Sequence, residues 1–150
     1  MDYYEAMRYI SDTYKFGSKA GLERISRLME LLGNPHKGMK YVHVAGTNGK
    51  GSVSSYISTI LTKAGYKTGL FIYPYIQRFS ERIRIDGQEI SYDDIVKNIL
   101  KIKEAIGIMS AENDDHPTEF EILTAMGLLH YAGNSCDIVV LEVGMGCIVD

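Results

Sequence analysis

The sequence predicts an α/β fold in which helices flank a partial, doubly wound parallel sheet. Residues 41–45, 69–72 and 137–143 are short β-rich segments, and the last of them is almost continuously apolar. Segments with helical spacing of apolar residues separate these strands, and a glycine-rich loop directly follows the first strand. Strands that alternate with helices in this way are typical of a parallel sheet covered on both faces.

The bulk composition is that of an ordinary globular protein and excludes several classes. Of the 150 residues, 45% are hydrophobic and 23% are charged, and the formal net charge is −3. This small negative charge gives no general attraction to nucleic acid or to an anionic membrane, so neither is expected as a partner. No apolar run approaches the roughly 18 residues that span a bilayer, and the first residues do not resemble a signal peptide. We therefore expect a cytoplasmic protein.

Two helices are predicted before the first strand, and a third after the glycine loop. One face of the first helix carries Tyr3, Met7, Ile10 and Tyr14. The second helix covers residues 22–32, has an apolar stripe, and stops at residues 33–35. The third helix is expected to bury one face made of Val53, Ile57, Ile60, Leu61 and Ala64.

Turn and cap residues place the remaining elements. Asp86-Gly87, between residues 83–85 and 88–90, predicts a tight hairpin because Asp-Gly favours the type I′ turn. Ser91 is expected to cap a helix that carries apolar residues as far as position 106. Thr118 and Glu121 have the spacing of a capping box, which would open a helix running to about residue 132.

Residues 46–52 form a candidate phosphate-binding loop between a strand and a helix. Glycine allows sharp turns and lets a ligand come close to the backbone. The N–H groups at the start of a helix, together with the helix dipole, attract phosphate. Lys50 can reach the β- and γ-phosphates of a nucleotide, and the Ser52 hydroxyl can hold Mg²⁺. ATP and Mg²⁺ are therefore the expected cofactors.

The spacing of this loop differs from the common G-x-x-x-x-G-K-[ST] pattern. That pattern would need glycine in place of Val44 and a hydroxyl residue in place of Gly51. The alternative interpretation is a glycine-rich turn that binds nothing, but the flanking strand, helix, lysine and hydroxyl favour a phosphate site. An unrelated phosphate-loop kinase is disfavoured as well, because the acid after the last strand is Glu142 and not an aspartate.

The segment Val44–Ser52 resembles the phosphate loop of the folylpolyglutamate synthases and dihydrofolate synthases, within the Mur ligase superfamily. Further segments match family motifs in the same order: Gly21–Ile25 ("GLERI"), Phe79–Gly87 ("FxERIRING"), Thr118–Ala125 ("TxFExLTA") and Leu141–Gly146 ("LEVGLG"). The resemblance spans nearly the whole chain. It implies that residues 1–150 are the N-terminal part of a Mur-ligase-like ATP-binding domain, with the rest of that domain and the C-terminal glutamate-binding domain absent.

The resemblance implies an ATP-dependent amide ligase. ATP would phosphorylate the carboxylate of a folate glutamate tail or of dihydropteroate, and the amine of L-glutamate would displace phosphate from the acyl phosphate. Lys50, together with Mg²⁺, would neutralise charge on the γ-phosphate and is the expected catalytic residue. The residues expected to bind the nucleotide are Gly46, Thr47, Asn48, Gly49, Lys50, Gly51 and Ser52.

A metal site is expected beside this loop. Glu142 ends a buried strand, and the carboxyl ends of such strands line the ligand crevice of α/β sheets. An acid after an apolar run is costly unless it is paired or bound to a metal, so Glu142 is expected to join Ser52 as a metal ligand. A buried ion pair is the alternative for Glu142.

Substrate residues are assigned by the resemblance alone. Gly21, Leu22, Phe120 and Glu121 would help to form the pterin-binding region. The alternative is that Leu22 and Phe120 are core contacts and that Glu121 caps a helix. Arg82 would bind phosphate or the polyglutamate tail, unless it lies on the solvent face of the hairpin.

The sequence departs from the family at several positions. Tyr73 stands where the family has a serine that ligates the metal, and Tyr75 replaces a histidine. A protonated phenol is a poor Mg²⁺ ligand, so a nucleotide-binding fragment or pseudoenzyme without ligase activity is the alternative function. Cys147–Asp150 also depart from the family pattern. With the later strands absent, residues 137–143 are expected to form an exposed sheet edge through which the fragment would self-associate.

Overall fold

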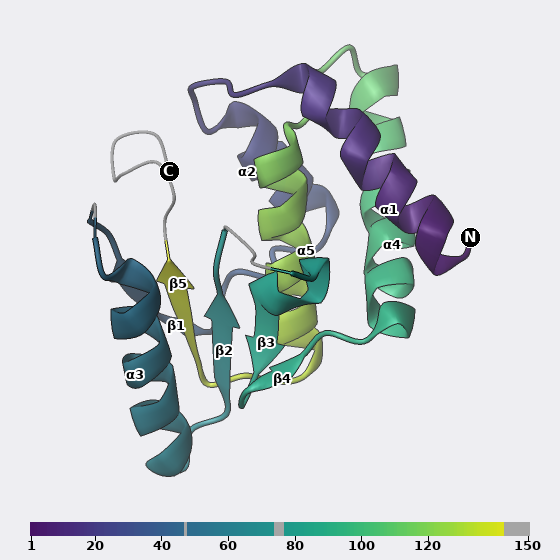
Figure 1. Cartoon of the computed structure of the whole chain (residues 1–150). Helices are drawn as coiled ribbons and strands as arrows, with labels where there is room; N and C mark the ends of the chain where they lie inside the picture. The colour runs from purple at the N-terminus through teal and green to yellow at the C-terminus, as the bar shows by residue number, and fades with distance from the viewer. Residues whose placement is uncertain (47, 74–76, 143–150) are drawn as a thin grey trace. The chain divides into compact units, whose positions relative to one another are not determined.

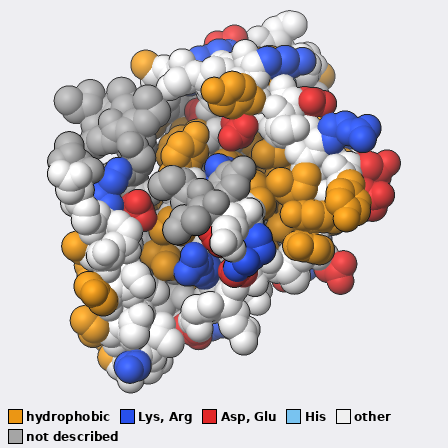
Figure 2. Space-filling view, viewed as in Figure 1, with side chains coloured by type: hydrophobic (Ala, Val, Ile, Leu, Met, Phe, Trp, Pro, Cys, Tyr) orange, Lys and Arg blue, Asp and Glu red, His pale blue; other side chains and the backbone are white. Residues whose placement is uncertain are grey.

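The computed structural model describes residues 1–46, 48–73 and 77–142. It has two compact units. The helical unit contains residues 1–37 and 91–130, and the sheet unit contains residues 38–90 and the segment from residue 131 onward. No helix in the described ranges is long and apolar enough to cross a membrane. Acidic and basic side chains lie near one another on the face shown in Figure 2.

The sheet unit contains a mixed five-stranded sheet with the order β1-β5-β2-β3-β4 (Figure 1). Its strands are β1 (Lys40–Val44), β2 (Thr68–Phe71), β3 (Ile83–Ile85), β4 (Gln88–Glu89) and β5 (Ile138–Glu142). Strand β5 pairs in parallel with both β1 and β2, whereas β2–β3 and β3–β4 are antiparallel. The α/β class and the parallel three-stranded part are therefore confirmed, and the predicted hairpin extends the sheet.

Strand β5 is central, so the expectation that it forms an exposed edge is wrong. Val140 is paired in register with Val42 of β1 and with Leu70 of β2. Val139 and Val140 have no exposed surface. A nearly continuous apolar strand is typical of a strand that is covered on both faces. The last strand in the sequence therefore lies inside the sheet, between the first and the second.

Helix α3 (Lys50–Lys63) lies along one face of the sheet (Figure 1). The small core beneath it consists of Val44, Leu70 and Val140, with Val42, Ile57, Leu61 and Ile72 packed around them.

The prediction of which residues of α3 are buried against the sheet is only partly correct. Ser54 is 0% exposed and Ser58 is 7% exposed, whereas Val53 is 46% exposed and Ile60 is 65% exposed. The small serines share the sheet-facing side with Ile57 and Leu61, and the 3.6-residue period then turns positions 53 and 60 outward. The positions of the apolar residues alone therefore did not identify which side of α3 faces the sheet.

The hairpin between β3 and β4 has the predicted turn. Asp86 and Gly87 have φ values of 49° and 83°, as a type I′ turn requires. The Asp86 side chain also fixes the turn to the sheet, because its Oδ1 accepts a hydrogen bond of 2.9 Å from the backbone N–H of Thr68.

The helical unit consists of α1 (Tyr3–Asp12), the 3₁₀ turn η1 (Thr13–Phe16), α2 (Glu23–Leu31), α4 (Tyr92–Ala111) and the part of α5 (Glu119–Gly133) up to residue 130. The predicted cap of α4 is confirmed, since Ser91 Oγ accepts a bond of 3.1 Å from the N–H of Asp94. Two residues of the predicted apolar stripes lie outside the α-helices and are exposed, Tyr14 at 76% and Leu22 at 69%. Tyr14 lies in η1, beyond the last residue of α1, and Leu22 precedes the first residue of α2.

Candidate functional site

The glycine loop connects the carboxyl end of β1 to the first turn of α3. Gly46 and Gly49 have positive φ values of 143° and 75°, which side chains with a Cβ rarely adopt. Gly49 is the N-cap of α3, and its carbonyl accepts the first helical hydrogen bond, 3.0 Å from the N–H of Val53. The loop therefore has the strand–loop–helix context that a phosphate site needs. Thr47, which is predicted to bind the nucleotide, lies outside the described residues.

Glu142 lies beside this first turn of α3. A Cβ added to Gly51 would be 4.0 Å from Oε2 of Glu142, which is ordinary van der Waals contact. Glu142 is also paired in register with Val44, the last residue of β1 before the loop. Lys50 is half-buried in the same turn, and Ser52 is exposed. The structure thus brings the predicted metal ligand Glu142 close to the predicted phosphate loop.

Burial and the neighbouring Lys50 have opposite effects on the pKa of Glu142. The side chain is 5% exposed, and its loss of water raises the pKa of the carboxyl above the usual value, while the charge of Lys50 lowers it. A bound cation would favour the ionised form in the same way as Lys50 does. Within the described residues, no group of three or more His, Cys, Asp or Glu side chains could hold a metal. One carboxylate and one hydroxyl fit Mg²⁺, which takes its remaining ligands from phosphate and water.

Arg82 is buried and lies in the 3₁₀ helix η2 (Phe79–Arg82), so the alternative interpretation, a position on the solvent face of the hairpin, is wrong. Its exposure is 9%, and its guanidinium carbon is 5.4 Å from the ring centre of Tyr73 and 5.5 Å from that of Phe79. These distances are those of cation–π contacts. The residue that departs from the family, Tyr73, therefore contacts a predicted substrate residue. Tyr75 and the residues after Glu142 lie outside the described part of the chain.

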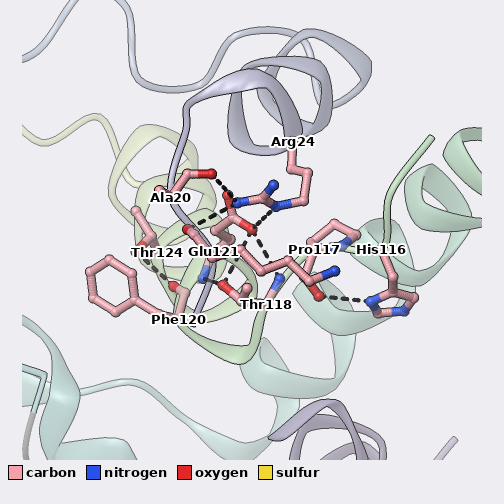
Figure 3. A network of polar contacts seen from close by, with 9 residues as sticks. Ala20, Arg24, His116, Pro117, Thr118, Phe120, Glu121 and Thr124 are labelled. Atoms are coloured by element: carbon pink, nitrogen blue, oxygen red, sulfur yellow. Dashed lines mark hydrogen bonds and ion pairs between the residues drawn. The ribbon is translucent and has the colours of Figure 1, made fainter. Parts of the chain in front are cut away.

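The other predicted substrate residues lie in the helical unit, around the start of α5 (Figure 3). Oε1 of Glu121 accepts hydrogen bonds from the N–H of Thr118 at 2.9 Å and from its Oγ1 at 3.2 Å. Oγ1 of Thr118 in turn accepts from the N–H of Glu121 at 3.2 Å, so the capping box is confirmed. Phe120 is half-buried, and Leu22 is exposed and not a core contact.

Arg24 belongs to this network, although it was not predicted from the sequence. Its Nε donates to Oε1 of Glu121 at 3.0 Å, and the two residues are each 8% exposed. An arginine one turn before Leu28, on the buried face of an amphipathic helix, is the pattern that could have identified it. A charged residue at such a position is expected to have a buried partner.

The chain is similar in sequence and in structure to known proteins along nearly its whole length. The chain is 41% identical over 145 residues to the dihydrofolate synthase/folylpolyglutamate synthase of Bacillus subtilis, covering 96% of this chain and 34% of that protein. The folylpolyglutamate synthase of Lacticaseibacillus casei is 36% identical over 147 residues.

Among solved structures, an FPGS–AMPPCP–folate complex matches with a TM-score of 0.94 and 35% identity over 100% of this chain and 37% of that chain. The folylpolyglutamate synthase of Thermotoga maritima matches with a TM-score of 0.89 and 42% identity, over 99% of this chain and 34% of that chain. The chain thus spans about a third of the length of these relatives. No protein-family model matches the sequence.

Proposed function

This chain belongs to the folylpolyglutamate synthase and dihydrofolate synthase family, and on that premise we propose that it is the nucleotide-binding N-terminal portion of an ATP-dependent glutamate ligase. The observation that carries the proposal is the position of Glu142 beside the first turn of α3. A buried carboxylate, a lysine and a loop of helix N–H groups together suit a magnesium nucleotide. The relative solved with AMPPCP, an analogue of ATP, supports the same ligand. We propose that the protein acts in the cytoplasm.

The proposed reaction has two steps that balance in atoms and charge. A carboxylate oxygen of folate or dihydropteroate attacks the γ-phosphorus of ATP, ADP leaves, and an acyl phosphate forms. The amine of L-glutamate then attacks the acyl carbon, phosphate leaves, and the nitrogen loses a proton as the amide forms. Lys50 neutralises charge on the γ-phosphate, and the remaining residues of the loop 46–52 bind the phosphates through backbone N–H groups.

Mg²⁺ would be held by Glu142 and Ser52, and when bound it would stabilise negative charge on the phosphates. The burial of Glu142 keeps its carboxylate poorly hydrated in the ligand-free chain, so a cation there regains a favourable interaction. The exposed hydroxyl of Ser52 lies on the same first turn of α3 as Lys50.

In the helical unit, Gly21, Leu22 and Phe120 are proposed to contact the pterin group of the substrate, with Glu121 completing this region. In the sheet unit, Arg82 is proposed to bind phosphate or the polyglutamate tail. Leu22 offers an exposed apolar side chain, and Phe120 offers a partly exposed aromatic ring, both of which suit a flat heteroaromatic group. Glu121 already accepts three hydrogen bonds on Oε1, so we assign it to the support of this region.

A nucleotide-binding protein without ligase activity is the second candidate. One observation favours it: Tyr73, two residues after β2, contacts Arg82 and stands where the resemblance implies a metal-ligating serine.

Calorimetric titration of the chain with Mg·AMPPCP tests the shared part of both candidates. Lys50→Ala should weaken binding by about tenfold or more, because a charge-assisted contact to phosphate is lost. Lys63→Ala, in the last turn of the same helix, is the matched control and should bind as the wild type does. Absence of binding by the wild type, or equal binding by Lys50→Ala, would contradict the proposal. Glutamate incorporation into folate, measured on this chain joined to the glutamate-binding part that the resemblance implies, then separates the two candidates.

A further inference from the structure

The loop of residues 17–22, here called the 17–22 loop, connects η1 to α2 and carries both Gly21 and Leu22. Gly17 and Gly21 have positive φ values of 68° and 102°. Glycine at both ends gives such a loop many accessible conformations, so its observed shape requires contacts from outside the loop.

Arg24 supplies these contacts. Its Nη2 donates to the carbonyl oxygens of Lys19 at 3.0 Å and Ala20 at 3.2 Å, while its Nε donates to Oε1 of Glu121 at 3.0 Å (Figure 3). One guanidinium thus joins the backbone of the loop to the start of α5. The planar fork of arginine makes this possible, and the single ammonium group of lysine does not have the same reach in two directions.

The acceptor of this contact is itself fixed. Thr118 donates to Oε1 of Glu121 through both its N–H and its Oγ1. The other end of the loop is also anchored, because the rings of Phe16 and His116 stack with their centres 3.9 Å apart and 8° between their planes. The start of α5 and the segment just before it therefore support the 17–22 loop at two points, in its middle through Arg24 and Glu121 and at its beginning through His116.

We infer that Arg24 is a positioning residue that holds the 17–22 loop in the conformation that binds the pteroyl group of the substrate. The inference rests on the proposed function in that Gly21, Leu22 and Phe120 are taken as the pterin-binding region. Arg24 touches no substrate in this assignment and acts through the backbone of Lys19 and Ala20. Arg24 and its partner Glu121 are each 8% exposed, so the contact between them is shielded from water, although residues 17–22 are themselves exposed.

Amide hydrogen exchange and pteroic acid titration on the intact chain test this role. Arg24→Lys keeps the charge but loses the fork, and it should speed exchange within residues 17–22 by about tenfold or more. Amides in the buried part of α4 should be unaffected, which a general loss of stability would not allow. The affinity for pteroic acid should fall by about tenfold as well.

Arg27→Lys is the matched control on the same helix. Nη2 of Arg27 donates to Oε1 of Glu112 at 2.9 Å and to Oε2 at 2.8 Å, and this contact does not involve the 17–22 loop. In the Arg27→Lys variant, the amide exchange rates of residues 17–22 and the affinity for pteroic acid should equal those of the wild type.

A second variant covers the case in which Arg24→Lys does not fold. Arg24→Met combined with Glu121→Leu replaces the buried pair with apolar side chains of similar size, a change that buried ion pairs often tolerate. Its loop should also exchange faster.

Unchanged exchange in the altered chains would overturn the inference. Faster exchange with unchanged pteroic acid affinity would also overturn it, since the loop order would then not serve the ligand. If the wild type does not bind pteroic acid, the proposed substrate region fails and the ligand part of the inference fails with it. The exchange data would still show separately whether Arg24 holds the loop.

Discussion

Gly51 and Glu142 approach each other so closely that a Cβ on Gly51 would lie 4.0 Å from Oε2 of the carboxylate. This approach brings the first turn of α3 next to the end of β5. Because Gly51 has an ordinary helical conformation, its lack of a side chain is not required by the backbone.

Gly51→Ala should therefore separate stability from binding. Alanine favours the helix and should raise the free energy of unfolding by up to about 1 kcal/mol. Its methyl group would occupy the space beside Glu142, and the affinity for Mg·AMPPCP should fall by about tenfold. Urea denaturation and calorimetric titration measure the two effects. A stable variant that binds as tightly as the wild type would show that the ligand does not use this space.

Tyr73→Ser restores the residue found in the family and tests what the tyrosine does. If a serine there ligates Mg²⁺, the affinity for Mg·AMPPCP should rise by about fivefold, or about 1 kcal/mol. The cation–π contact with Arg82 is lost at the same time, which should lower the free energy of unfolding by about 0.5–1 kcal/mol.

Tyr73→Phe is the control for this change, because it keeps the ring and removes only the hydroxyl. Its stability and its nucleotide affinity should match those of the wild type. A gain in affinity with phenylalanine as well would mean that the phenol hydroxyl hinders the nucleotide and that serine is not acting as a ligand.

The elements that could be predicted from the sequence are those fixed by local chemistry. The turn at Asp86-Gly87, the cap at Ser91 and the capping box of Thr118 and Glu121 each depend on residues close together in the chain. The strand–loop–helix context of residues 46–52 was predictable for the same reason, since the glycines and Lys50 are close together in the chain. The acidic residue Glu142 was correctly expected at a strand end, beside this loop.

The features that could not be predicted depend on pairing between distant segments. The central place of β5 depends on which two strands flank it, and the alternation of strands and helices does not specify that order. The burial of Ser54 and Ser58 depends on how closely α3 approaches the sheet. Arg24 and Arg82 are buried because of partners or aromatic rings that hydrophobic periodicity does not reveal.

Glu89 should make the stability of the sheet unit depend on pH in the acid range. Its carboxylate accepts bonds of 2.7 Å from Nη2 of Arg78 and 2.7 Å from Oγ of Ser80. These contacts lower the pKa of Glu89 from 4.5 to about 2. A lowered pKa in the folded state means that the stabilisation is present above about pH 4.5 and is lost as the pH falls toward 2.

Glu89→Gln should remove this contribution. Because the pair is partly exposed to solvent, the loss at neutral pH should be about 1 kcal/mol, and the difference from the wild type should shrink as the pH approaches 2. Urea denaturation at several pH values measures it. A difference that stays constant from neutral pH to pH 2 would mean that the ionised carboxylate is not the source.

Gly69 and Gly107 should respond oppositely to the same substitution. In β2, a Cβ on Gly69 would lie 2.7 Å from Cδ1 of Tyr131, which is far inside contact distance. The ring cannot move easily, because Tyr131 has no exposed surface and its hydroxyl donates to the carbonyl oxygen of Leu70 at 2.7 Å. Gly69→Ala should therefore lower the free energy of unfolding by about 2–3 kcal/mol.

Gly107 lies inside α4, where a Cβ would meet nothing within 4 Å. Gly107→Ala should stabilise the helical unit by up to about 1 kcal/mol, because alanine is the better helix former. Measuring both variants by urea denaturation controls for a general effect of the added methyl group. If Gly69→Ala is as stable as the wild type, the sheet and the Tyr131 ring must be able to separate, and the close approach of β2 to Tyr131 would not be required for stability.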